Sequence, residues 1–165
     1  MRMFRPYNIA YLLFALLLVA CGSTGNKEQN VFRMNMSGKA LESLDPAFAK
    51  DQYTMWTANL LYNTLVATDG QLHLAPSLAK SWQISDDGLT YTFHLRNDVY
   101  FHDNPDFPNG KGRRMTAQDV VYSFNRITDP LTASPGAWIF NERVVEKNPF
   151  TAIDDTTFRI QLIKP

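Results

Sequence analysis

The chain has a single cysteine, no excess of either charge and no apolar run long enough to span a bilayer. With Cys21 alone, an intramolecular disulfide is excluded. The 16 basic and 16 acidic residues cancel, which argues against a nucleic-acid binder, because such a protein shows a basic face. The longest apolar run, from Ile9 to Val19, is about eleven residues, whereas a transmembrane helix needs about 20.

Signatures of catalysis and metal binding are missing as well. We find no nucleophile elbow, no paired catalytic carboxylates and no Cys/His arrangement. The segment 109–114 looks like a phosphate-binding loop, but it lacks the first glycine, and Gly112 replaces the Ser/Thr that would touch magnesium. His73, His94 and His102 lack the spacing and clustering of metal ligands. We therefore expect no enzyme, no metal site and no cofactor.

The first twenty residues predict a lipoprotein signal peptide. Arg2 and Arg5 precede the apolar run, and the residues up to Cys21 have the spacing of a bacterial lipobox. We expect cleavage after residue 20, a lipid on Cys21, and anchoring to a membrane in the cell envelope, on its periplasmic or extracellular side. An uncleaved N-terminal anchor helix is the alternative.

Residues 21–30 are polar and without apolar spacing, so we expect them to form a flexible tether. Loss of Arg2 and Arg5 from the 16 basic residues leaves 14 against 16 acidic residues in the mature part. The sequence from residue 31 to 165 predicts a mixed α/β domain. It opens with alternation typical of a strand over 31–36, and apolar residues at helical spacing follow over 52–65.

Turn residues and periodicity predict further elements downstream. A turn over 85–88 precedes strict alternation from 90 to 96, which is typical of a half-buried strand. A second short strand is expected over 99–102. Thr116, with an acid three residues later, predicts a helix N-terminus. A turn and a strand are expected between 150 and 162.

Motifs along the whole chain carry a family resemblance. They are S-L-D-P at 43–46, L-Y-N-T-L at 61–65, A-x-S-W at 79–82, D-G-x-T-Y-T-F-x-L-R at 87–96, V-x-F-H-D at 99–103, R-x-T-A-x-D-V-V-Y-S-F at 114–124 and D-P-x-T-A-S-P at 129–135. In this order they resemble the family 5 extracellular solute-binding proteins, which are the oligopeptide, dipeptide and nickel receptors of ABC importers.

The resemblance implies the N-terminal portion of a two-lobed periplasmic-binding-protein fold of class II, with a mixed sheet and helices. Family members are several times longer, and the chain ends at Pro165 directly after a predicted strand. We therefore expect an N-terminal fragment, in which residues 31–165 form an incomplete first lobe.

By the same resemblance, the protein is expected to capture oligopeptides or dipeptides and to pass them to ABC permease subunits served by a separate ATPase. The D-P-x-T-A-S-P run favours peptides over nickel or a sugar, the alternative solutes. Two other classes stay open. One is a secreted lipoprotein enzyme whose catalytic part lies downstream, and the other is a receptor-like part retained for signalling or scaffolding.

The loop after the S-L-D-P motif is the expected ligand-facing segment. In peptide-binding relatives the matching loop runs an extended backbone past the ligand, as an added strand would. By position this implicates Lys50, Asp51, Gln52 and Tyr53. The alternative is structural, with Asp51 and Gln52 starting a helix and Tyr53 in the core. Asn63 stands where the family often has an acid, so no carboxylate role is transferred to it.

Overall fold

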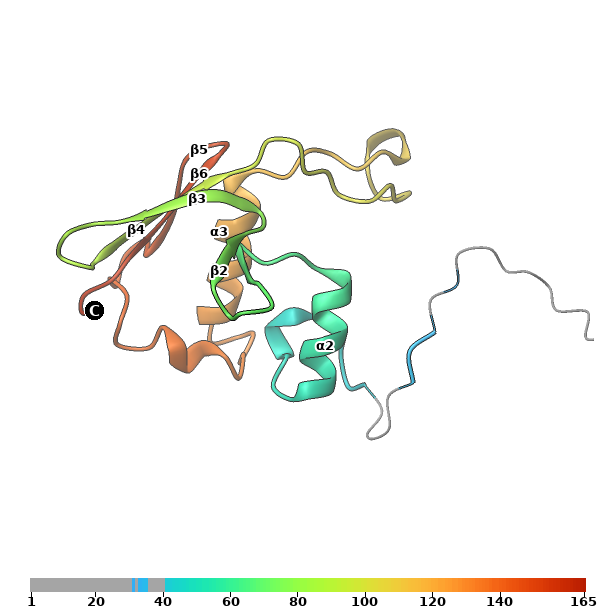
Figure 1. Ribbon diagram of the computed structural model, residues 1–165, viewed down its shortest axis with the longest axis horizontal. Helices are drawn as coiled ribbons and strands as arrows, with labels where there is room; N and C mark the ends of the chain where they lie inside the picture. Colours follow the sequence, from blue (N-terminus) through green and yellow to red (C-terminus); the bar gives the residue numbers. More distant parts are fainter. Residues whose placement is uncertain (1–30, 32, 36–40) are drawn as a thin grey trace, which may run out of the picture. The chain divides into compact units, whose positions relative to one another are not determined.

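The structure is a computed structural model that describes residues 31, 33–35 and 41–165 (Figure 1). The chain divides into two units, Met1–Ser37 and Gly38–Pro165, and each is described by itself. Every helix and strand that the structure describes belongs to the second unit. Among the described residues, no helix is both long and apolar enough to cross a membrane.

Several expectations for the N-terminal region fall on residues that the structure does not describe. The signal peptide (1–20), the lipid-bearing Cys21 and the tether (21–30) all lie outside the described residues. For the strand expected over 31–36, the described positions, Val31 and Arg33–Asn35, lie in no strand.

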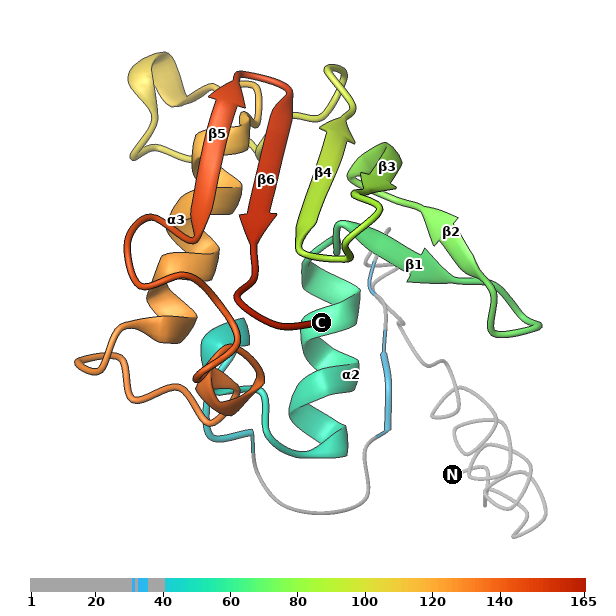
Figure 2. The same ribbon diagram turned by 90° about the vertical axis from the view of Figure 1, so that its left-hand side faces the viewer.

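A four-stranded antiparallel sheet has the order β3-β4-β6-β5. Its strands are β3 (Ala79–Ile84), β4 (Thr90–Leu95), β5 (Phe150–Asp154) and β6 (Thr157–Gln161). The register places Trp82 opposite Phe93 and Phe93 opposite Phe158, so one apolar row crosses three strands. Helix α3 (Ala117–Thr128) packs against β5 and β6 (Figure 2).

Local turn chemistry explains both hairpins of this sheet. Between β3 and β4, Gly88 adopts a left-handed φ of 70°, a conformation that glycine reaches without a steric penalty. Asp154 closes the β5–β6 turn by accepting a hydrogen bond from Thr156 N at 2.7 Å. The strands predicted over 90–96 and near the end of the chain are therefore confirmed, and the mixed α/β class is confirmed with them.

Helix α3 begins where the sequence predicts. Thr116 is its N-cap, and Thr116 N donates to Asp119 Oδ2 at 2.8 Å within a capping box. Asp119 also accepts a bond from Arg113 Nη1 at 2.8 Å. On the inner face, Val120 and Val121 are buried, and the Phe124 ring lies in the aromatic core. The cap and the apolar face together fix how the helix meets the sheet.

We expect Asp119 to make stability sensitive to acid. The bond from Arg113, opposed by burial and aided by Thr116, holds the pKa of Asp119 below its ordinary 3.8. Because the folded-state pKa is the lower one, this contribution is complete above pH 3.8 and is lost as the pH falls through the folded value. Asp119→Asn should cost about 1 kcal/mol at neutral pH and much less in acid.

Urea unfolding of both proteins across this pH range measures the difference. Asp86→Asn, at an exposed position in the β3–β4 turn, is the control and should follow the wild type at every pH. A constant gap between Asp119→Asn and the wild type, down to the lowest pH, would contradict the assignment.

Helix α2 (Gln52–Leu61) is shorter than the helix predicted over 52–65. The chain turns extended at Tyr62 and enters β1 (Val66–Thr68), which pairs with β2 (Leu74–Pro76). Ala79 N donates to the carbonyl of Leu65 at 2.9 Å, so tertiary hydrogen bonds replace the last helical turn. Large apolar side chains of α2 stay about half exposed, with Trp56 at 49% and Leu60 at 57%.

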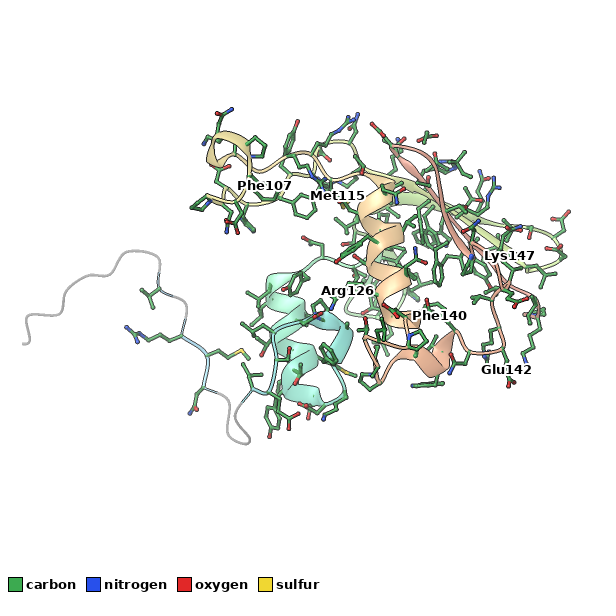
Figure 3. All side chains as sticks on the ribbon, turned by 180° about the vertical axis from the view of Figure 1, so that it is seen from behind. Phe107, Met115, Arg126, Phe140, Glu142 and Lys147 are labelled. Atoms are coloured by element: carbon green, nitrogen blue, oxygen red, sulfur yellow. The ribbon has the colours of Figure 1, made fainter. Side chains whose placement is uncertain are left out.

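An arm between β4 and α3 departs from the prediction. The strand expected over 99–102 is only a single bridge, between Tyr100 and Arg114. The arm extends away from the sheet, with Phe107 on the arm and Met115 at its base beside α3 (Figure 3). A short 3-10 helix, η2 (Pro108–Gly110), forms its turn. In the outer part of the arm, Pro105 and Pro108 on either side of Phe107 have no backbone N–H to donate to a ladder.

Candidate functional site

The S-L-D-P motif forms a capped turn. Asp45 Oδ1 accepts a bond from Ala47 N at 3.0 Å, and Asp45 N donates to Ser43 Oγ at 3.0 Å. The short 3-10 helix η1 (Pro46–Phe48) follows, with the proline in its first turn, where the missing N–H costs no hydrogen bond. The motif therefore reverses the chain just before the expected ligand-facing segment.

Asp51 is the N-cap of α2. Its Oδ1 accepts bonds from Tyr53 N at 3.0 Å and Thr54 N at 3.1 Å, and its Oδ2 accepts from Thr54 Oγ1 at 2.9 Å. The hydrogen bonds from Thr54 hold the pKa of Asp51 below its ordinary value, and the bond from Tyr53 N lowers this pKa to a smaller extent. This carboxylate is committed to starting the helix, which is the structural alternative given for it above.

The other three predicted residues differ in what they touch. Lys50 Nζ lies 3.1 Å from Glu42 Oε2, and both side chains are exposed. Gln52 is the exposed first residue of α2. The Tyr53 ring meets the Trp56 ring edge-on, with centroids 6.3 Å apart, and takes no part in the buried core. The alternative that placed Tyr53 in the core is therefore wrong.

A pocket of about 390 Å³ joins this region to the loop after α3. Of the four predicted residues, Lys50 and Asp51 line it, whereas Gln52 and Tyr53 do not. Ala133 and Pro135 line its other side, although they lie about eighty residues further along the chain. The full lining is Glu42, Ser43, Phe48, Lys50, Asp51, Thr54, Ala133 and Pro135.

The backbone beside this pocket is extended and available. Ala49 has φ −68° and ψ 97°, and Asp51 has φ −125° and ψ 163°. Within the described part of the chain, the N–H groups of Lys50 and Asp51 donate no hydrogen bond. An extended segment with free amide donors is what another extended chain pairs with, as a strand adds to a sheet edge.

Sequence reasoning missed Ala133 and Pro135. Their D-P-x-T-A-S-P run carries the family resemblance and favours a peptide ligand, but it indicates no contact with the S-L-D-P loop. No periodic signal links positions 133–135 to 42–51, so the contact across the pocket was not predictable from local pattern. Among the residues that the structure describes, no three His, Cys, Asp or Glu side chains gather as metal ligands would.

Comparison with known proteins matches the chain to one family. The family model described as "Bacterial extracellular solute-binding proteins, family 5 Middle" matches residues 73–165. A dipeptide-binding protein of Lactococcus lactis is 33% identical over 164 residues, covering 93% of this chain and 28% of the relative. Heme-binding protein A of Haemophilus influenzae is 41% identical over 117 residues, covering 63% of this chain and 20% of the relative.

Solved structures agree with this match. DppA from Helicobacter pylori, in complex with the peptide STSA, is 37% identical with a TM-score of 0.60, covering 74% of this chain and 25% of that one. NikZ from Campylobacter jejuni, in complex with Ni(L-His), is 29% identical with a TM-score of 0.63, covering 77% of this chain and 23% of that one. The chain spans about a quarter of the length of these proteins.

Proposed function

Because the chain belongs to the family 5 bacterial extracellular solute-binding proteins, we propose that it is part of a receptor that captures short peptides for an ABC importer. It is a binding protein and not an enzyme, as its relatives are. In this proposal the lipid on Cys21 and the tether over 21–30 hold the receptor at the membrane. A second lobe closes on the ligand, and permease subunits with a separate ATPase import it.

The extended backbone over 49–51 carries the proposal. Within the described part of the chain, the N–H groups of Lys50 and Asp51 donate no hydrogen bond, so they can bind the carbonyl groups of an extended ligand, and main-chain pairing of this kind accepts many peptide sequences. The peptide-binding relatives support the same class of ligand. The pocket beside the segment has room for a side chain of such a peptide.

Substitution at Lys50 separates backbone pairing from side-chain contact. Lys50→Pro removes one N–H donor, and the extended Ala49 before it is compatible with a following proline. We expect Lys50→Pro to weaken peptide affinity about tenfold or more, because a buried carbonyl of the ligand loses its partner. Lys50→Ala removes only the exposed ammonium and should change affinity less than about threefold.

Isothermal titration calorimetry measures the peptide affinity of both variants. The protein used is the full encoded chain, with any residues that the reading frame adds after Pro165. The ligand is the tightest-bound member of a defined di- and tripeptide library. Equal loss in the two variants would assign the contact to the side chain. No binding of any library peptide to the wild type would overturn the proposed function.

A metal-chelate or haem receptor is the second candidate. NikZ in complex with Ni(L-His) and heme-binding protein A match this chain at an identity similar to that of the peptide receptors. Titration with Ni(L-His) and with haem beside the peptide library separates the candidates. Saturable binding of either, with no bound peptide, would replace the peptide proposal.

A further inference from the structure

Two side chains from distant parts of the sequence hold the segment that leads to Lys50. Arg126 on α3 points toward η1 (Figure 3), and its Nη1 and Nη2 donate to the two carboxylate oxygens of Asp45 at 3.1 and 2.7 Å. Ser134 Oγ donates to the carbonyl of Ala47 at 2.6 Å. A forked arginine–carboxylate pair fixes orientation as well as distance. The segment is therefore held at two successive points.

Ser134 is itself set in place by its loop. Ala133 adopts a left-handed φ of 49°, which is uncommon for a residue with a side chain. Gly136 N donates to Ser134 Oγ at 3.2 Å, and Ser134 is only 7% exposed. The hydroxyl that bonds to Ala47 is thus buried and oriented. The same loop supplies Ala133 and Pro135 to the far side of the pocket.

Asp45 couples this contact to the local turn. The Asp45 carboxylate accepts the hydrogen bond from Ala47 N at the start of η1, and it also accepts the two hydrogen bonds from the Arg126 guanidinium. Both partners are partly buried, with side chains 30% and 35% exposed. The bond from Arg126 is also the largest cause that lowers the pKa of Asp45. Loss of Arg126 would remove one of the two external contacts that hold this turn.

We propose that Arg126 and Ser134 are positioning residues for the ligand segment 49–51. They hold η1 against α3 and its loop, and so set the segment's place across the pocket from Ala133 and Pro135. This inference rests on the proposed function, because it gives that segment the ligand-binding role. Neither side chain lines the pocket, so their effect on a ligand is indirect.

Arg126→Gln tests the proposal, with Arg113→Gln as the matched control. Arg113 makes the same forked pair with Asp119 at the opposite end of α3, away from the pocket. If loss of the fork leaves segment 49–51 correctly placed only a tenth of the time, apparent peptide affinity falls about tenfold. We expect this fall in Arg126→Gln, partial recovery in Arg126→Lys, and wild-type affinity in Arg113→Gln.

Two readouts separate positioning from general stability and from the proposed function itself. Titration of the best-bound library peptide gives affinity, and hydrogen exchange at the amides of Ala47, Phe48 and Ala49 reports on the segment without ligand. Faster exchange there in Arg126→Gln but not in Arg113→Gln supports the inference, and Ser134→Ala repeats the test if Arg126→Gln does not fold.

Four results would contradict either the positioning role or the proposed function. Equal loss of affinity in Arg126→Gln and Arg113→Gln, or unchanged exchange in Arg126→Gln and Ser134→Ala, would overturn the positioning role. Unchanged affinity despite faster exchange would also overturn it. A wild type that binds no peptide would overturn the proposed function, while the exchange data still decide whether Arg126 holds the segment.

Discussion

Replacing Phe158 by alanine should lower the free energy of unfolding by about 3–5 kcal/mol. Phe158 is fully buried in the middle of the four-stranded sheet. Its ring centroid lies 6.1 Å from that of Phe93 and 5.1 Å from that of Phe124. It is therefore the residue through which β4, β6 and α3 share one core.

The size of this effect follows from where the cavity would form. Truncation removes apolar contacts on both the strand side and the helix side, and a close-packed interior relaxes only partly around the space. The neighbouring strands β4 and β5 are held to β6 by backbone hydrogen bonds, so they cannot move inward to fill the cavity. Phe158→Leu retains much of the volume and should lose less.

Urea denaturation followed by circular dichroism measures both variants. Leu131→Ala is the control for truncation of an apolar side chain, because Leu131 is 94% exposed, and it should change stability by less than about 0.5 kcal/mol. A loss below about 1 kcal/mol in Phe158→Ala would mean that Phe158 is not central to the core.

The sequence predicts the elements that depend on local interactions, and it does not predict those that depend on interactions between distant residues. The start of α3 at Thr116, the alternation from Thr90, and the turn and strand near the end of the chain were predictable, because each depends on residues within one turn or one strand. The end of α2 was not, because a tertiary bond from Ala79 to Leu65 competes with the helix. Likewise, a short strand was expected over 99–102, but only Tyr100 forms a bridge, with Arg114.

The candidate site shows the same division. Asp51 was predicted both as a ligand contact and as a helix start, and local hydrogen bonds confirm the helix start. Only the structure places Asp51 beside the pocket. Arg126 and Asp45 are 81 residues apart, and no spacing rule relates them. The family resemblance indicates positions 50–53, of which Lys50 and Asp51 line the pocket, whereas the residues that hold the segment have no local signal.

Gly112→Ala should disrupt the arm between β4 and α3. A Cβ at Gly112 would stand 2.9 Å from the carbonyl oxygen of His102 and much closer to the carbonyl of Phe101. Both neighbours are backbone, so neither can move aside as a flexible side chain would. We expect a cost of about 1–3 kcal/mol, typical of overpacking, because the two sides of the arm must separate.

The structure indicates which contacts this separation breaks. Phe101 N donates to the carbonyl of Arg113 at 3.0 Å, and Gly112 N donates to Asp103 Oδ1 at 3.0 Å. The Arg113 guanidinium also lies over the Phe101 ring, 4.9 Å from its centroid. Hydrogen exchange at Phe101 and Gly112 should therefore accelerate in the variant by more than exchange in β4 and β6.

Gly70→Ala is the matched control. Its Cβ would meet nothing within 4 Å, and Gly70 does not need a left-handed φ. Alanine there should leave stability unchanged or raise it by up to about 1 kcal/mol, since it restricts the unfolded chain. Equal thermal stability and equal hydrogen exchange in the two alanine variants would contradict this prediction. They would show that the two sides of the arm can separate at no cost, and that the close approach of Gly112 to the backbone of Phe101 and His102 does not stabilise the fold.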